Sequence, residues 1–228
     1  MTISRPIGAL LGALAAACAL TGQAGAAAKS CASSYSYAGL AAHGSAHGVA
    51  AVIAPLAQPN VVRGHVAAWV GVGGAGYGPH GTDEWLQVGL SAFEGSDSGL
   101  YFEIKQPSYP AKYFQIREHV AAGERHRLAV LEVHGRPSVW RVWVDGSPPS
   151  PAFYLPGSKM GWEPEATAES WNDGAGVCNG YSYAFSRVAL ARARGGSWQR
   201  LSRGYSFVDP GYRMLRRSTA SFVATGND

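Results

Sequence analysis

Alternation of aliphatic residues with aromatic or polar ones is the feature that most constrains the fold of this 228-residue chain. In the stretch HVAAWVGVG, valine and alanine recur at every second position, and Trp69 and Gly71 stand between them. Because successive side chains of a strand point to opposite faces, this period of two predicts a β-strand with one aliphatic and one aromatic face. The stretch EWLQVGL, residues 84–90, repeats the pattern and carries Gln87 on its second face.

Short alternating runs of this kind recur between clusters of Gly, Pro, Asp and Ser, and helix signals are almost absent. This pattern is typical of all-β sandwiches and barrels. The expected strands are residues 46–55, 61–73, 84–93, 99–106, 112–118, 126–134, 138–145, 165–171, 181–192, 197–203 and 211–223. Residues 29–40 form either a further strand or an arm, and residues 205–228 either cover the ligand face or complete a sheet.

The N-terminus has the pattern of a secretory signal peptide. Arg5 precedes an apolar run at residues 7–20, and small residues follow this run. The run is too short to span a membrane as a helix. We therefore expect residues 1–27 to be a signal peptide, residues 28–228 to form one domain, and the protein to be secreted. A lipid anchor at Cys18 is the alternative, because AAAC resembles a lipoprotein signal.

Two cysteines, Cys31 and Cys178, follow the predicted signal peptide. In an exported protein we expect them to form one disulfide, and two free buried thiols are the alternative. The formal net charge of +4 is mild, and the sequence contains no basic and aromatic motif of the nucleic-acid-binding type. We expect a monomer without a nucleic-acid partner and without a membrane span.

The second faces of the strands carry aromatic and polar residues together. A face that only meets solvent would be rich in Lys, Thr and Ser, whereas aromatic rings around a few polar groups are typical of a ligand groove. Burial of the same polar groups in a second core would carry a large desolvation cost. The candidate residues of this groove are Trp69, Trp85, Gln87, Tyr101, Glu103, Arg141, Trp143, Glu169 and Trp171.

Several common site motifs do not fit the chain. Residues 71–76 have the spacing GxGxxG, but a turn and a strand follow them where a dinucleotide site needs a helix. The seven histidines form no zinc pattern, and the sequence contains neither the acidic run of a calcium loop nor a GxSxG motif. We therefore expect neither a metal ion nor a cofactor.

The order of the strand motifs resembles that of the glutamic endopeptidases, or eqolisins. The motifs are WVGVGG, WLQVGL, LYFEI, WRVWVDG and AESW, between residues 69 and 171. The resemblance implies a two-sheet antiparallel jelly-roll sandwich of the concanavalin A-like type, which lectins and many glucanases share. It also implies that Gln87 is the catalytic glutamine, that Glu169 is the catalytic glutamate, and that Trp69 belongs to the groove.

The chemistry implied by this resemblance uses an acid and an amide. A glutamate carboxylate takes a proton from the water that attacks an amide carbonyl, and the glutamine NH₂ donates to the oxyanion that forms. Tyr101 and Glu103 fall where the family has a Tyr-Glu pair, although Phe102 separates them here. Ser170 interrupts the family's motif after the glutamate, and Glu165 is an alternative acid on the same face.

Three functions are compatible with the pattern. The first, which we favour, is a secreted endopeptidase-like hydrolase in which Gln87 and Glu169 act on a polypeptide. The second is a non-catalytic lectin-like module whose four candidate tryptophans stack on the rings of a polysaccharide. The third is a glycoside hydrolase that uses Glu103 and Glu169 as its pair of carboxyl groups.

Overall fold

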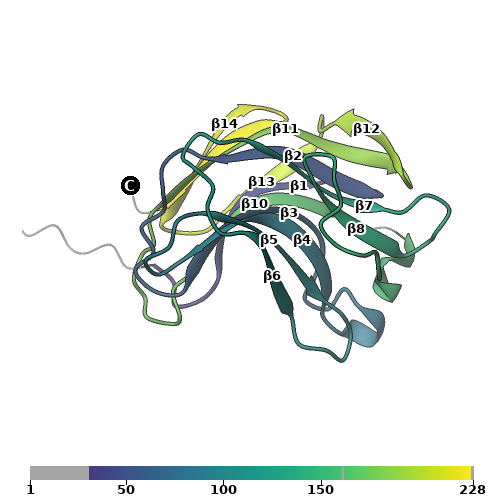
Figure 1. Cartoon of the computed structure of the whole chain (residues 1–228), viewed down its shortest axis with the longest axis horizontal. Coiled ribbons are helices and arrows are strands. Elements are labelled where there is room, and N and C mark those ends of the chain that lie inside the picture. The colour runs from purple at the N-terminus through teal and green to yellow at the C-terminus, as the bar shows by residue number, and fades with distance from the viewer. Residues whose placement is uncertain (1–30, 161, 227–228) are drawn as a thin grey trace, which may run out of the picture.

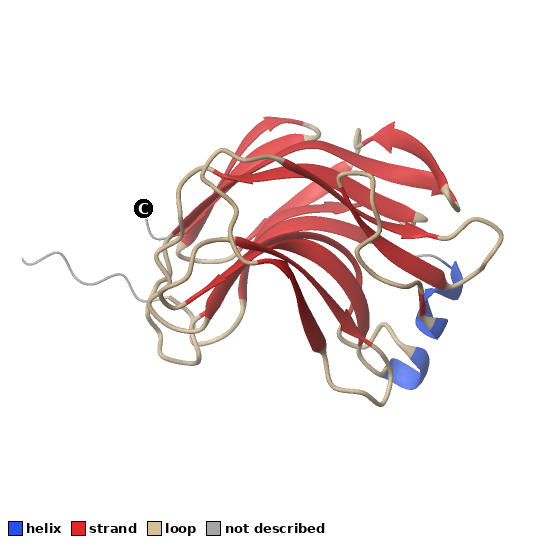
Figure 2. Ribbon diagram, viewed as in Figure 1, coloured by secondary structure: helices blue, strands red, loops and turns tan. Residues whose placement is uncertain are grey.

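The computed structural model describes residues 31–160 and 162–226, which form two stacked antiparallel β-sheets (Figure 1). Almost all of the regular structure is strand, and two short 3₁₀ turns, η1 (Pro79–Gly81) and η2 (Pro156–Met160), complete it (Figure 2). The strands are β1 (Ser36–Ala42), β2 (Gly48–Pro55), β3 (His65–Gly74), β4 (Glu84–Phe93), β5 (Gly99–Lys105), β6 (Lys112–Arg117), β7 (His126–Glu132), β8 (Val139–Val144), β9 (Phe153–Tyr154), β10 (Pro164–Trp171), β11 (Tyr181–Ala193), β12 (Gly196–Arg200), β13 (Gly204–Val208), β14 (Tyr212–Ser218) and β15 (Ser221–Gly226). The predicted two-sheet antiparallel sandwich is confirmed.

The two sheets differ in strand order. The seven-stranded sheet has the order β13-β1-β10-β3-β4-β5-β6, and the eight-stranded sheet has the order β14-β15-β11-β2-β7-β8-β9, with β12 added beside β11. The strands β3 to β6 arch, and the hollow side of the arch is turned away from the eight-stranded sheet (Figure 1). We call that hollow side the concave face.

The core lies between the sheets and is built from the aliphatic faces of the strands. Val66, Val70, Leu86 and Val88 are fully buried in it, together with Trp140 from the opposite sheet. Complete burial of one such aliphatic side chain stabilises the fold by roughly 1.5–3 kcal/mol. The parity expected for residues 66–72 and 84–90 is therefore confirmed, and it leaves the intervening side chains for the concave face.

The strand predictions fail mainly near the C-terminus. Residues 211–223, expected as one strand, form the hairpin of β14 and β15, with Ser218 paired to Ser221. The short strand β9 and the edge strand β13 were not predicted at all. The segment that includes residues 205–226 completes both sheets, because β13 pairs with β1 while β14 and β15 join the eight-stranded sheet.

The predicted disulfide between Cys31 and Cys178 is present and spans 147 positions of sequence. It joins the segment before β1 to the loop between β10 and β11. Such crosslinks persist in oxidising compartments. The predicted signal peptide and the alternative lipid anchor at Cys18 lie outside the described residues, and within those residues no helix is long and apolar enough to cross a membrane.

Replacement of both Cys31 and Cys178 by serine should lower the free energy of unfolding by roughly 2–5 kcal/mol, because the crosslink restricts a long loop of the unfolded chain. Urea unfolding of the wild type and the double variant, each at the same pH, measures the difference. Ser197→Ala, at an exposed position of β12, serves as the control. Equal urea midpoints for the double variant and the wild type would contradict the prediction.

Candidate functional site

The concave face takes its polar residues from four adjacent strands. In the register of the sheet, Glu165 of β10 faces Gly71 of β3, Gly71 faces Gln87 of β4, and Gln87 faces Glu103 of β5. Glu169 lies four residues further along β10 and faces Ala67. Because side chains alternate between faces, all of these residues emerge on the same side of the sheet.

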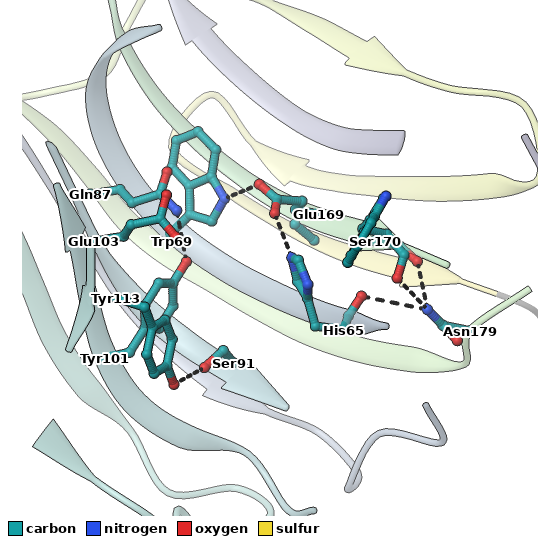
Figure 3. Close-up of polar contacts among 12 residues, drawn as sticks. His65, Trp69, Gln87, Ser91, Tyr101, Glu103, Tyr113, Glu169, Ser170 and Asn179 are labelled. Atoms are coloured by element: carbon teal, nitrogen blue, oxygen red, sulfur yellow. Dashed lines mark hydrogen bonds and ion pairs between the residues drawn. The ribbon is translucent and has the colours of Figure 1, made fainter. Parts of the chain in front are cut away.

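The indole of Trp69 occupies the centre of this face (Figure 3). Its Nε1 donates a hydrogen bond to Oε2 of Glu169 at 3.0 Å. Gly71 makes room for the ring, because a Cβ at this position would lie 2.9 Å from the Cζ3 atom of Trp69. A Cβ at Gly89 would collide with the backbone oxygen of Ala68 and lie 2.7 Å from the Cβ of Trp69. The glycine two residues after Gln87 in the motif LQVG is therefore required by the close approach of β3.

Glu169 is held from two sides. Besides the bond from Trp69, Nε2 of His65 lies 3.1 Å from Oε1 of Glu169. The residue is only 6% exposed. A carboxylate offers about four lone-pair sites, so these two contacts leave capacity for a further donor. The carboxylate is thus fixed in orientation and can still accept a further hydrogen bond.

Gln87 belongs to a chain of polar contacts on the other side of the indole. Its Nε2 donates to the hydroxyl oxygen of Tyr101 at 3.0 Å. The ring of Tyr101 stacks on that of Tyr113 at a centroid distance of 5.1 Å, and the hydroxyls of Tyr113 and Ser91 are 2.8 Å apart. Burial raises the pKa of Tyr101 well above its usual value, so the hydroxyl that receives the Gln87 amide stays protonated.

Two further carboxyl groups lie on the same face and have raised pKa values. Oε1 of Glu103 accepts a hydrogen bond from Nε1 of Trp85 at 2.9 Å. Burial raises the pKa of Glu103, and the charge of Glu169 adds to this while the bond from Trp85 opposes it. Burial raises the pKa of Glu165 to about 7, and the charge of Glu163 contributes. Both of these carboxyl groups therefore hold their protons to a higher pH than an exposed glutamate does.

Aromatic rings surround Glu169 at one end of the face. The ring of Trp171 stacks on that of Tyr35 with centroids 5.7 Å apart. The imidazole of His65 lies 5.6 Å from Trp171 and 5.8 Å from Phe93, measured between ring centroids. Tyr35 and Phe93 are exposed, so this end of the face offers apolar surface to a ligand.

Seven of the nine predicted groove residues share the concave face, and two do not. Arg141 and Trp143 lie on β8, which belongs to the eight-stranded sheet, and their side chains alternate with the core residues Trp140 and Val142. They therefore face outward from the opposite side of the sandwich, and their assignment to the same groove was wrong. Parity identifies the face of a strand but not the sheet to which the strand belongs. The residues on the concave face are Trp69, Trp85, Gln87, Tyr101, Glu103, Glu169 and Trp171.

Sequence reasoning missed His65, Tyr35 and Tyr113, which contact this set directly, and it missed Ser91 and Phe93, which contact Tyr113. His65 could have been found, because it has the parity of Trp69 on the same strand. Ser91 and Phe93 likewise share the parity of Gln87 on β4. Tyr35 precedes β1 and carries no such signal. Among the residues that the structure describes, no group of three or more His, Cys, Asp or Glu side chains could hold a metal ion.

Comparison with solved structures finds chains of similar architecture. The structure of scytalido-glutamic peptidase with a peptide-based transition state analogue aligns with a TM-score of 0.57 and 12% identity over 84% of this chain and 98% of that chain. A second structure of that peptidase, with a transition state analogue inhibitor, aligns with a TM-score of 0.53 and 10% identity over 85% and 98% of the two chains. The fold is that of the glutamic peptidases.

A further member of the eqolisin family, in complex with the tripeptide Ala-Ile-His, aligns with a TM-score of 0.48 and 10% identity over 85% of this chain and 98% of that chain. No protein-family model and no curated protein sequence matches the chain. At such low identities the similarity establishes the glutamic-peptidase fold alone. Any role of individual residues rests on the contacts described above.

The raised pKa of Glu165 predicts a pH dependence of stability. Between the ordinary glutamate pKa and about 7, the folded state binds more protons than the unfolded state, so stability falls as the pH rises through this window. Glu165→Gln removes this loss and should raise the free energy of unfolding by about 1–3 kcal/mol above pH 7, with little change near pH 4.

Urea unfolding of Glu165→Gln and the wild type across this pH range measures the effect. Glu118→Gln, at an exposed position, is the matched control and should follow the wild type. If the difference between Glu165→Gln and the wild type does not grow with pH, the carboxyl group is not buried as described.

Proposed function

We propose that the chain is a secreted endopeptidase-like hydrolase in which Gln87 and Glu169 activate water against peptide bonds. The observation that carries the proposal is the arrangement around Trp69: the amide and the carboxylate emerge on the same face, on either side of one indole (Figure 3). The indole binds the carboxylate directly, and Gly71 lies between the indole and Gln87, because a Cβ at Gly71 would lie 2.9 Å from Cζ3 of Trp69 and 3.0 Å from Cβ of Gln87.

Glu169 is suited to act as the general base and then as the general acid. It has spare acceptor capacity beyond the contacts with Trp69 and His65. The carboxylate takes a proton from water as the water oxygen bonds to the carbonyl carbon of the substrate. The same proton then passes to the amide nitrogen as the C–N bond breaks, which releases an amine and a carboxylic acid.

Gln87 is suited to stabilise the oxyanion. An amide NH₂ has two donors, and the hydrogen bond to Tyr101 uses one of them. The second donor is free for the substrate oxygen as negative charge develops on it. Because the amide is neutral and 8% exposed, it offers this donor without adding a charge beside Glu169.

The surroundings favour a polypeptide that places an apolar side chain near Glu169. The rings of Tyr35, Phe93 and Trp171 line that end of the face, and the first two are exposed. The solved glutamic peptidase with this fold binds a peptide-based transition state analogue, which supports a peptide as the substrate class. The Cys31–Cys178 disulfide and the signal-peptide pattern of residues 1–27 support secretion.

One observation favours glycoside hydrolysis as a second candidate. The charge of Glu169 raises the pKa of Glu103, beyond the larger effect of burial, so the two carboxyl groups act on one another across the face. A retaining or inverting glycosidase needs one carboxyl group that stays protonated beside one that is ionised. Release of reducing sugar from a panel of glucans, lost in Glu103→Gln, would favour this candidate over peptide hydrolysis.

The endopeptidase proposal predicts cleavage of denatured casein by the purified protein at some pH between about 3 and 8. Gln87→Ala should lower kcat by about 10²–10³-fold, because one oxyanion donor is lost. Glu169→Gln should lower kcat at least about 10²-fold, because the base is lost. Mass spectrometry of the released peptides measures both effects.

Matched controls separate a chemical defect from a folding defect. Gln199→Ala and Glu118→Gln change the same residue types at exposed positions and should keep wild-type activity. Circular dichroism and the urea midpoint of each variant report on folding. Absence of casein cleavage by the wild type across this pH range, or full activity of folded Glu169→Gln, would overturn the proposal.

A further inference from the structure

The outer face of the eight-stranded sheet carries a hollow of about 230 Å³, on the side of the sandwich opposite to the concave face. Trp143 of β8 and Trp198 of β12 both line it. Pockets for drug-sized ligands measure roughly 300–1,000 Å³, so a hollow of this size suits a single ring better than a larger group. The two tryptophans are separated in the sheet by β7, β2 and β11.

The strands between the tryptophans offer a floor of small residues. Ala129 pairs with Trp143, and Ala191 pairs with Trp198. Both alanines are buried, as is Ala50 of β2, which pairs with Ala129. Trp143 and Trp198 are only partly buried, so part of each indole stays exposed to solvent beside these small residues. Indole faces bind the apolar C–H faces of sugar rings in the same way that they bind other flat apolar groups.

One N–H group in the lining of the hollow lacks an acceptor. Nε1 of Trp143 has no hydrogen-bond partner among the described residues. Most buried polar groups in proteins are paired, so an unpaired donor in a hollow indicates a ligand or water at that position. A hydroxyl or carboxylate oxygen of a sugar is a suitable acceptor for this group.

Unneutralised positive charge points to an acidic sugar. The guanidinium of Arg127 lies over the ring of Trp198, 5.7 Å from its centroid. The ion pairs of the described residues include neither Arg127 nor Arg141. The nearby carboxylate of Asp145 is engaged by His126 and by the backbone N–H of Arg127. Guanidinium groups bind carboxylates through two parallel hydrogen bonds, which gives a preference for uronic acids over neutral sugars.

A second hollow of about 390 Å³ continues the basic surface beyond the turn between β11 and β12. His134, Arg192 and Arg194 line it, and Gly195 of the same turn lines the first hollow. Glu132 is buried beneath and lies 3.0 Å from Nε of Arg194, so it balances only part of this charge. A chain of several acidic sugar units could therefore make contacts on both sides of the turn.

We propose that the outer face of the eight-stranded sheet binds an acidic oligosaccharide, with one uronate ring between Trp143 and Trp198 and its carboxylate beside Arg127. This site is separate from the concave face and does not depend on the function proposed for Gln87 and Glu169. It gives Trp143 a binding role although this residue lies on the other sheet from the remaining candidates.

Isothermal titration calorimetry of the full chain with tetragalacturonate and with neutral cellotetraose tests the proposal. We expect tetragalacturonate to bind more tightly than cellotetraose, and Trp143→Ala and Trp198→Ala each to weaken that binding at least about ten-fold. Arg127→Ala should remove most of the preference for the acidic ligand.

Two controls locate the binding. Trp171→Ala changes an indole on the concave face, and Arg217→Ala removes an exposed charge from another strand of the same sheet, so both should bind like the wild type. Urea midpoints show that each variant is folded. No binding of tetragalacturonate, equal binding of cellotetraose, unchanged binding in both Trp143→Ala and Trp198→Ala, or loss of binding in Trp171→Ala would each overturn the proposal.

Discussion

The requirement to bury one face of every strand controls the rest of this structure. In β3, β4 and β10, each aliphatic side chain that enters the core commits its neighbours in sequence to the concave face. A shift of register by one residue would drive Gln87 and Glu169 into the core and expose leucine and valine. The desolvation of two polar side chains would oppose such a shift. Every second residue of these strands packs into the core, and this packing places the intervening residues of the candidate site on the concave face.

Trp69 links this packing to the chemistry of the face. Its indole needs the space left by Gly71, and its N–H then reaches the carboxylate of Glu169. Glycine weakens a strand because it has no side chain to pack, but here the neighbouring ring fills the vacant space. Tryptophan, glycine and glutamate thus form one structural unit across β3, β4 and β10. The strand order β10-β3-β4 is what brings its members together.

Local pattern was sufficient to predict most of the strands and the faces of β3 and β4, because each of these segments shows the period of two in its own sequence. It was not sufficient to assign each strand to a sheet, since that depends on pairings between distant segments. Arg141 and Trp143 have the same parity pattern as Trp69, yet β8 pairs with β7 in the other sheet. The stack of Tyr35 on Trp171 joins an irregular segment to a strand, and the local periodicity of the sequence does not predict such a contact. The two-residue strand β9 is too short to show a period.

The place of β1 in the seven-stranded sheet affects the order in which the molecule can assemble. β1 lies between β10 and β13, so Gly39 pairs with Thr167 on one side and with Phe207 on the other. Both partners lie more than 100 positions further along the chain, and such high contact order makes folding slow. During biosynthesis β1 therefore has no neighbour until most of the polypeptide has been made, and the sheet that bears Glu169 is among the last parts to close.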